Sequence, residues 1–323
     1  MTEVTDVAAG VTGAVLLLLV CLSVLRTVFA PGQRSSRAAR WTARVAARAV
    51  ARAARGLPPN AAGRVLDLCA PLGLCALAAV WLLGVSGGCG LLAVAAGTPV
   101  RLVIERPGVA GEAAVLLAVF VVVAFTTMLV RIGGAYERRE RALVQLVAEV
   151  PLPADIDTVL AMCIGSTSRA RIDHRFEEWA SWFADIQYTH LSYPVLLYSR
   201  PAGDMSWTRA AVIALDSAAL VESMAPGWAP HQTRVLLTCG VSCLTKLCAA
   251  AGITTPATGP SHQGREENTF GDAVRYAMDA GLKPEREHEQ MWSTFQELRG
   301  RYAPRSTAIC HVLGYDIDRP AYP

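Results

Sequence analysis

The chain has 323 residues, a formal net charge of +3 and a hydrophobic fraction of 53%. Together with a mean hydropathy of +0.34, this fraction exceeds that of ordinary soluble domains and indicates a membrane protein. Only Lys246 and Lys283 among the 30 basic residues are lysines, so the positive charge is arginine in local clusters. Such a distribution disfavours a general nucleic-acid-binding surface.

Three segments are long and apolar enough to cross a bilayer. The first covers residues 8–25, the second starts near Val65 and reads VLDLCAPLGLCALAAVWLLGV, and the third covers residues 113–130. Each has about 18 to 21 residues, close to the ~20 that a helix needs to cross the hydrocarbon layer. The leader of the first segment carries Glu3 and Asp6, where a cleavable signal has positive charge. We therefore expect all three segments to remain in the membrane.

The distribution of arginines predicts the orientation. Residues 31–64 carry eight arginines, whereas residues 86–112 carry two. Four more follow the third segment closely: Arg131, Arg138, Arg139 and Arg141. Because short loops rich in arginine stay in the cytoplasm, the amino terminus is predicted to lie outside, with residues 31–64 and the carboxy-terminal region inside.

An arginine stripe follows the first segment. Its members recur every three or four residues and would share one face of a helix: Arg34, Arg37, Arg40, Arg44, Arg48, Arg52 and Arg55. Between two spans on the positive side, these side chains are predicted to contact the anionic headgroups of the bilayer surface. The alternative is a solvated helix that packs on the cytoplasmic domain. Nucleic acid is not expected as a partner, because the topology already explains the charge.

Residues 84–112 lie between the second and third segments and are long enough to enter the membrane as a short helix and return. Glycines at 87–90 and 108–111 would permit the necessary bends. A span, a re-entrant segment and a further span form the pore of tetrameric cation channels, in which backbone carbonyls line a selectivity filter. The segment is therefore expected to be an outer loop or a re-entrant segment.

Several stretches resemble those of bacterial potassium-channel-like proteins of the two-pore-domain or ion-channel family. They are VLRTVFAPG (24–32), YERRERALVQL (136–146), WASWFADIQYTHLSYPVLLYSR (179–200) and SWTRAAVIALDSAAL (206–220). The resemblance implies membrane helices followed by a helical cytoplasmic region, and assembly with itself or with a related channel subunit. Such channels carry a T-x-G-Y-G-D-like filter before the last pore helix, and residues 84–112 contain none.

The cytoplasmic region is predicted to be helical. A charged run at 135–150 should continue the third span, and PLPADIDTVLAM (151–162) should start another helix after a proline-marked break. An amphipathic face is expected further on, at Phe176, Trp179, Phe183 and Ile186. Ser206 is predicted to be the N-cap of the next helix.

The last third of the chain contains one ambiguous apolar segment. Residues 232–252 resemble a fourth span, but Arg234 and Lys246 favour a buried helix of a bundle. A linker rich in proline and glycine follows at 253–268, and then a polar helical pair at 270–280 and 284–301.

Candidate catalytic or metal-binding residues are weak. Cys239, Cys243 and Cys248 lie on one predicted helix without a completing histidine, so buried packing is expected rather than a metal or redox site. His174, His190 and Asp216 are the residues that could act in proton transfer, and no nucleotide-binding, metalloprotease or nucleophile motif accompanies them. If Asp216 is buried, it needs a partner such as Arg209 or a histidine.

The sequence thus predicts an all-α integral membrane protein with about three transmembrane helices and a helical cytoplasmic domain, and neither an enzyme nor a cofactor protein. Its predicted function is that of a degenerate, non-conducting pore-type subunit in the plasma membrane, assembled as a homo-oligomer or with a related channel subunit. The alternative is a membrane-anchored scaffold or regulatory protein. The predicted regions are an outer terminus and first span (1–33), an arginine-rich interfacial helix (34–64), a channel-like helix pair with its intervening segment (65–131), a helical cytoplasmic domain (132–252) and a linker with a polar tail (253–323).

Overall fold

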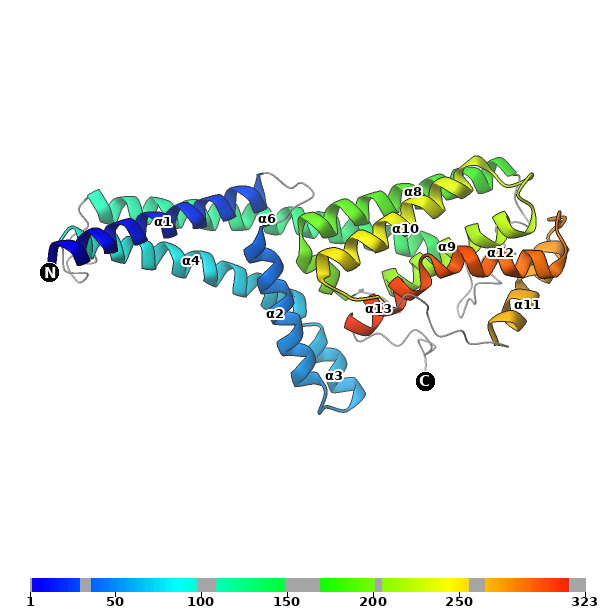
Figure 1. Cartoon of the computed structure of the whole chain (residues 1–323), viewed down its shortest axis with the longest axis horizontal. Helices are drawn as coiled ribbons and strands as arrows, with labels where there is room; N and C mark the ends of the chain where they lie inside the picture. The colour runs from blue at the N-terminus through cyan, green and yellow to red at the C-terminus, as the bar shows by residue number, and fades with distance from the viewer. Residues whose placement is uncertain are drawn as a thin grey trace. The chain divides into compact units, whose positions relative to one another are not determined.

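The computed structural model describes residues 2–29, 36–97, 109–148, 169–200, 205–255 and 265–313. Of these residues 86% are helical and none lies in a strand, which confirms the predicted all-α fold (Figure 1). The elements are, in chain order, α1 (Thr2–Val28), α2 (Arg37–Ala54), α3 (Pro59–Leu66), α4 (Cys69–Ala95), α6 (Val109–Ala148), α8 (Arg169–Ser192), the 3-10 helix η1 (Pro194–Tyr198), α9 (Trp207–Met224), α10 (His231–Ala251), α11 (Arg265–Asp279), α12 (His288–Gly300) and α13 (Ala303–Leu313).

The chain divides into two compact units. The N-terminal unit comprises Met1–Ala135 and Thr189–Ser199, and the C-terminal unit comprises Tyr136–Tyr188 and Arg200–Pro323. Helices α6 and α8 each contribute residues to both units.

Helices α1 and α4 of the N-terminal unit pair in antiparallel fashion through small residues. A Cβ atom placed on Gly13 would lie 2.8 Å from the carbonyl oxygen of Gly88, and one placed on Gly84 would lie 2.5 Å from Cγ2 of Val20. Gly84 and Gly88 have the G-x-x-x-G spacing that lets apolar helices approach closely. Near the other end of the pair, the indole nitrogen of Trp81 donates to Oγ of Ser23 at 3.1 Å.

The expected break at 87–90 is wrong, because α4 continues through these glycines to Ala95. Glycine weakens an isolated helix by about 1 kcal/mol relative to alanine, but here the missing side chain of Gly88 admits Leu17 of α1. Contact with α1 thus favours the straight helix. Residues 98–108, which include the rest of the proposed re-entrant segment before α6, lie outside the described residues.

The second apolar segment also starts differently from the prediction near Val65. The helix α3 ends at Leu66, a turn follows at Asp67 and Leu68, and α4 begins at Cys69. The charged Asp67 therefore lies in the turn before the long apolar helix.

Helix α6 confirms that the charged run after the third apolar segment continues the same helix. It has 40 residues and runs to Ala148, which corresponds to about 60 Å and is twice the thickness of a hydrocarbon core. Four side chains of α6 are buried and lie on the face that it turns to the interior of the N-terminal unit: Val121, Ala124, Met128 and Ile132. The helix predicted at PLPADIDTVLAM lies outside the described residues.

Four helices in the described part of the chain are long and apolar enough to cross a membrane, one more than expected. The spans are Val4–Val28, Ala61–Ala95, Gly111–Gln145 and His231–Ala251, of which the last is the least apolar. The fourth corresponds to α10, the segment for which the sequence left two interpretations open.

The C-terminal unit is organised around α9, whose side chains are buried on nearly every side. Helix α10 packs on it closely, since a Cβ atom on Gly240 would lie 2.4 Å from Cδ2 of Leu215. Ser206 caps α9 by accepting a hydrogen bond from the backbone nitrogen of Arg209, as predicted. The amphipathic face of α8 is also confirmed, because all four of its predicted members are buried: Phe176, Trp179, Phe183 and Ile186.

The polar helical pair near the carboxy terminus is present as α11 and α12, with bounds shifted by a few residues. Phe270 of α11 packs against the rings of Trp292 and Phe295 of α12, with centroids 5.1 and 4.9 Å away. A third helix, α13, was not predicted. Pro304 is the second residue of α13. A proline fits there because the backbone N–H that it lacks would have no acceptor in the first turn of a helix.

Candidate functional site

The candidate site is the arginine face of α2. Ser36 caps this helix by accepting a hydrogen bond from the backbone nitrogen of Ala39 at 3.1 Å. Of the arginines in the predicted stripe, Arg34 lies outside the described residues. The others follow one face of α2 and its C-cap, four of them exposed (Arg37, Arg48, Arg52 and Arg55) and two half-buried (Arg40 and Arg44). The structure thus brings these six together on one surface.

The opposite face of α2 is buried and consists of small residues: Ala39, Thr42, Ala43, Ala46, Ala47, Val50 and Ala54. It packs on α4 and η1 within the N-terminal unit. A Cβ atom on Gly73 of α4 would lie only 3.5 Å from Cα of Ala43. The alanine face is therefore occupied by protein, and the face that α2 leaves to its surroundings is the arginine face.

Trp41 belongs to this exposed face and was not predicted as a site residue. It is 61% exposed, and Val45, one turn further, is 40% exposed. At helical spacing, Trp41 lies one turn from both Arg37 and Arg44. The sequence signal that could have found it is a single large aromatic side chain within a run of alanine and arginine.

A group of hydrogen bonds fixes where α2 starts. The hydroxyls of Thr27, in the last turn of α1, and of Ser36, the N-cap of α2, lie 2.8 Å apart. Arg131 of α6 donates to the carbonyl oxygen of Val28, which is one of the free acceptors at the end of α1. The end of α1, the start of α2 and the middle of α6 at Arg131 are therefore held at one level of the N-terminal unit.

Tyr198 of η1 is a buried phenol near the half-buried part of the stripe. Burial raises its pKa above the ordinary value, and the positive charges of Arg44 and Arg48 lower it in part. The phenol is therefore neutral at physiological pH.

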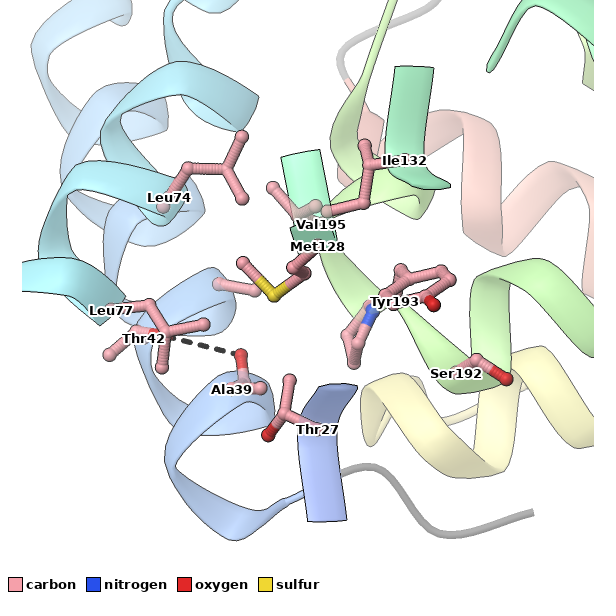
Figure 2. Close-up of a pocket in the computed structure, with 13 residues that line it drawn as sticks. Thr27, Ala39, Thr42, Leu74, Leu77, Met128, Ile132, Ser192, Tyr193 and Val195 are labelled. Atoms are coloured by element: carbon pink, nitrogen blue, oxygen red, sulfur yellow. Dashed lines mark hydrogen bonds between the residues drawn. The ribbon is translucent and has the colours of Figure 1, made fainter. Parts of the chain in front are cut away.

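A small pocket lies where α1, α2, α4, α6 and η1 converge (Figure 2). It has about 280 Å³ of empty space, part of which is open to the surroundings, and its lining includes Leu74, Leu77, Met128, Ile132 and Val195. No acidic, basic or histidine side chain lines it, but four residues with hydroxyl groups do: Thr27, Thr42, Ser192 and Tyr193. Drug-sized ligand pockets have about 300 to 1,000 Å³ and a few polar groups that orient the ligand. Because part of the space is open to the surroundings, the enclosed part lies below this range, and we assign no ligand to the pocket.

A second, wider hollow lies in the C-terminal unit between the last turns of α6 and the first half of α8. It has about 990 Å³ of empty space, part of it open to the surroundings. Its lining combines the indoles of Trp179 and Trp182 with the imidazole of His174 and the carboxyl groups of Glu177 and Glu178. His174 is exposed and forms ion-pair contacts with both glutamates, at 3.7 and 3.6 Å.

The remaining residues considered for proton transfer have structural surroundings. Asp216 is 1% exposed, and its Oδ1 accepts hydrogen bonds from the hydroxyl of Tyr302 and from Nε of Arg299. The partners of Asp216 are therefore Arg299 and Tyr302, near the carboxy terminus, rather than the predicted Arg209 or a histidine. His190 is buried beside the hydroxyl of Thr189, 3.2 Å from its Nδ1.

Two of the three cysteines considered for metal or redox chemistry, Cys243 and Cys248, are buried, as packing requires, and Cys239 is half-buried. Within the described part of the chain, no group of three or more histidine, cysteine or acidic residues has the arrangement of a metal site.

Comparison with protein-family models, with curated proteins and with solved structures finds no match to the chain.

Proposed function

We propose that this chain is an integral membrane protein with three spans, α1, α4 and α6, and a cytoplasmic helical bundle. The observation that carries this proposal is the character of the exposed side chains. Along α1 the exposed large side chains are aliphatic: Val4, Val7, Val11, Val15, Leu18, Leu19, Leu22 and Leu25. Along the apolar half of α6 they are also apolar: Val115, Leu116, Val119, Phe120, Val122, Val123, Leu129 and Val130. Lipid is the environment that such surfaces require.

Helix α10 is assigned to the bundle, because its exposed face is polar. His231, Arg234, Thr238, Thr245 and Lys246 are exposed, whereas its apolar side chains face α9 and α13. A crossing would place Lys246 in hydrocarbon. An amphipathic helix of this kind covers a soluble core.

The proposed orientation places the amino terminus outside the plasma membrane and the C-terminal unit in the cytoplasm. The arginine excess at residues 31–64 and after α6 supports it. The hydrogen bond from Arg131 to Val28 is consistent with this assignment, since it joins the predicted cytoplasmic end of α1 to the residue that follows the third apolar segment within α6.

We further propose that the chain conducts no ions by itself. A conducting pore of this class needs a filter of backbone carbonyls, and residues 84–112 contain no T-x-G-Y-G-D-like sequence. In addition, the hydroxyls of Thr126 and Thr127 bond to carbonyl oxygens of their own helix, Val122 and Val123, and leave no polar lining along this part of α6.

Two roles are compatible with a non-conducting membrane protein. The first is a membrane-anchored scaffold or regulatory protein, supported by the hollow between α6 and α8, where indoles and charged side chains would meet a partner segment. The second is a degenerate pore-type subunit, assembled with itself or with a related channel subunit, supported by the quoted resemblance and by the apolar exposed face of α6. We favour the first, because residues 84–112 contain no T-x-G-Y-G-D-like filter.

Topology labelling tests the membrane proposal. Single cysteines would be introduced at Arg40, Arg101 and Lys283 in a variant whose native cysteines are replaced. A membrane-impermeant maleimide should label position 101 in intact cells and positions 40 and 283 only after permeabilisation. External labelling of position 40, or recovery of the chain in the water-soluble fraction, would contradict the proposal.

Ion flux tests the non-conducting assignment, and subunit number distinguishes the two roles. Purified protein in liposomes should give no cation flux above that of protein-free liposomes. A monomer in mild detergent supports the scaffold, and a stable tetramer or a co-purifying channel subunit supports the pore-type subunit. Flux that ordinary pore blockers abolish would overturn the non-conducting assignment.

A further inference from the structure

We propose that the first two turns of α2 form a membrane anchor in which Trp41 enters the headgroup region and Arg37 and Arg40 bind the phosphates of anionic phospholipids. The inference deepens the proposed function and rests on its membrane assignment. It differs from a uniform contact along the whole stripe, because it assigns the contact to one end of α2 and adds a residue that is not an arginine.

The start of α2 is tied to the end of a proposed span. The hydroxyls of Ser36 and Thr27 lie 2.8 Å apart, and Thr27 also donates to the carbonyl oxygen of Ser23 within α1. Trp41 lies five residues after Ser36, which is about 7.5 Å along a helix axis. Whatever the tilt of α2, this rise changes the depth of the helix axis between Ser36 and Trp41 by at most about 7.5 Å.

The orientation of the side chain follows from the packing of α2. The alanine face is buried against α4 and η1, and Trp41 lies on the exposed face with 61% of its surface accessible. Tryptophan is enriched at the membrane–water interface, because its indole has an apolar body and one polar N–H group. Entry of the Trp41 ring into the headgroup region would therefore explain why this large side chain is exposed.

The segment around this end supplies no anionic side chain of its own. No acidic residue occurs between Asp6 and Asp67. Arg37 is exposed and Arg40 is half-buried, and both lie in the first turn of α2, next to the end of α1. Phospholipid phosphate is the anion at that level, and each arginine near an anionic surface contributes about 1 kcal/mol.

The far end of the stripe provides a matched control. Arg52 is 16 residues after Ser36 and Arg55 is 19 residues after it, which corresponds to about 24 and 29 Å along the helix if it leaves the membrane steeply. Both are exposed arginines on the same face. The double variant Arg52→Gln/Arg55→Gln therefore has the same charge change as Arg37→Gln/Arg40→Gln but leaves the proposed anchor intact.

The experiment measures quenching of Trp41 by brominated lipid in nanodiscs that contain the full-length protein. The Trp41 signal is the difference between the protein and its Trp41→Phe variant. Brominated phosphatidylserine should quench it more strongly than brominated phosphatidylcholine. In Arg37→Gln/Arg40→Gln, the phosphatidylserine fraction needed for half-maximal quenching should rise up to about 25-fold, or about fivefold per arginine, whereas Arg52→Gln/Arg55→Gln should change it by less than about twofold.

Three outcomes would overturn the proposal. The first is a Trp41 signal that neither lipid quenches, and the second is equal quenching by the two lipids. The third is an equal shift in the two double variants, which would indicate a helix lying flat with the whole stripe on the surface. Stable insertion into nanodiscs together with correct topology labelling separates these outcomes from a failure of the membrane assignment itself. Competition by added nucleic acid or by an acidic peptide, without lipid quenching, would assign the arginines to a different partner.

Discussion

Replacement of Asp216 with alanine should destabilise the C-terminal unit by about 3 kcal/mol, because it removes the acceptor of one buried and one partly buried hydrogen bond. The carboxylate lies on the central helix α9, and Oδ1 accepts from the Tyr302 hydroxyl and from Nε of Arg299. Tyr302 is fully buried, so its hydroxyl would remain in the protein interior without this acceptor. Breaking a buried pair by removal of one partner is costly for this reason.

Hydrogen–deuterium exchange of the full-length protein in detergent measures this effect locally. Amides of α9 and α12 should exchange about 100-fold faster in Asp216→Ala than in the unmodified protein. Asp272→Asn is the control, because Asp272 forms an exposed ion pair with Arg275 at 2.7 Å, and such pairs contribute at most about 1 kcal/mol. If Asp216→Ala exchanged no faster than Asp272→Asn, the buried cluster would not hold the carboxy-terminal helices.

The same cluster predicts a dependence on alkaline pH. Burial, and next to it the negative charge of Asp216, raises the pKa of Tyr302 well above its ordinary value of 10.0. Because the folded state keeps a proton that the unfolded state releases, stability should be constant below about pH 10 and fall as the pH rises further. Tyr302→Phe should reduce this fall, measured by denaturant unfolding at pH 9 to 11. An unchanged alkaline slope would show that other tyrosines cause it.

The parts of the fold that were predicted correctly are those with strong local signals. The apolar runs in α1 and α6 have the length of a span, and the spacing of Phe176, Trp179 and Phe183 gives the buried face of α8 without knowledge of its neighbours. Ser206 was predicted as a cap because a serine before an apolar helix has one dominant local role. Each of these features depends on residues within a few positions.

The features that were missed depend on contacts between distant residues. Arg299 and Tyr302 are 83 and 86 positions from Asp216, and no pattern in the sequence near Asp216 points to them. The glycines of α4 predict a bend when considered alone, and only the contact with Gly13 and Leu17 of α1 explains a continuous helix.

The arginine stripe shows the same limit at the candidate site. Its periodicity predicted one cationic face, which the described arginines have. The spacing of Trp41 from Arg37 and Arg44 places it on this face, but the exposure of the face follows only from the packing of α2 on α4 and η1. The contact of the stripe with lipid remains a prediction.

Replacement of Gly13 with alanine should separate α1 from α4 and destabilise the N-terminal unit by about 1 to 3 kcal/mol. The added Cβ atom would lie 2.8 Å from the carbonyl oxygen of Gly88 and 3.0 Å from Cβ of Leu91. Backbone atoms cannot move aside as a flexible side chain does, so the helices must shift apart along their shared interface. Apolar helices in lipid lack a hydrophobic driving force toward each other, and the loss of close packing is therefore not offset.

Gly90→Ala is the matched control, because Gly90 lies on α4 and a Cβ atom there would meet nothing within 4 Å. Alanine favours a helix over glycine, so this variant should be neutral or more stable by up to about 1 kcal/mol. Thermal unfolding in detergent should place Gly13→Ala below and Gly90→Ala at or above the unmodified protein.

A double variant tests whether Gly13 and Gly88 act at one contact. A Cβ atom on Gly88 would lie 2.7 Å from Cγ of Leu17 and 3.2 Å from the carbonyl oxygen of Gly13. Once Gly13→Ala has separated the helices, Gly88→Ala meets a gap that is already open, so the two substitutions together should cost less than the sum of their separate effects. Strict additivity of the two effects would place the two glycines at independent contacts and contradict the proposed interface. Equal melting temperatures for the single variants Gly13→Ala and Gly90→Ala would show that α1 and α4 do not pack through these residues.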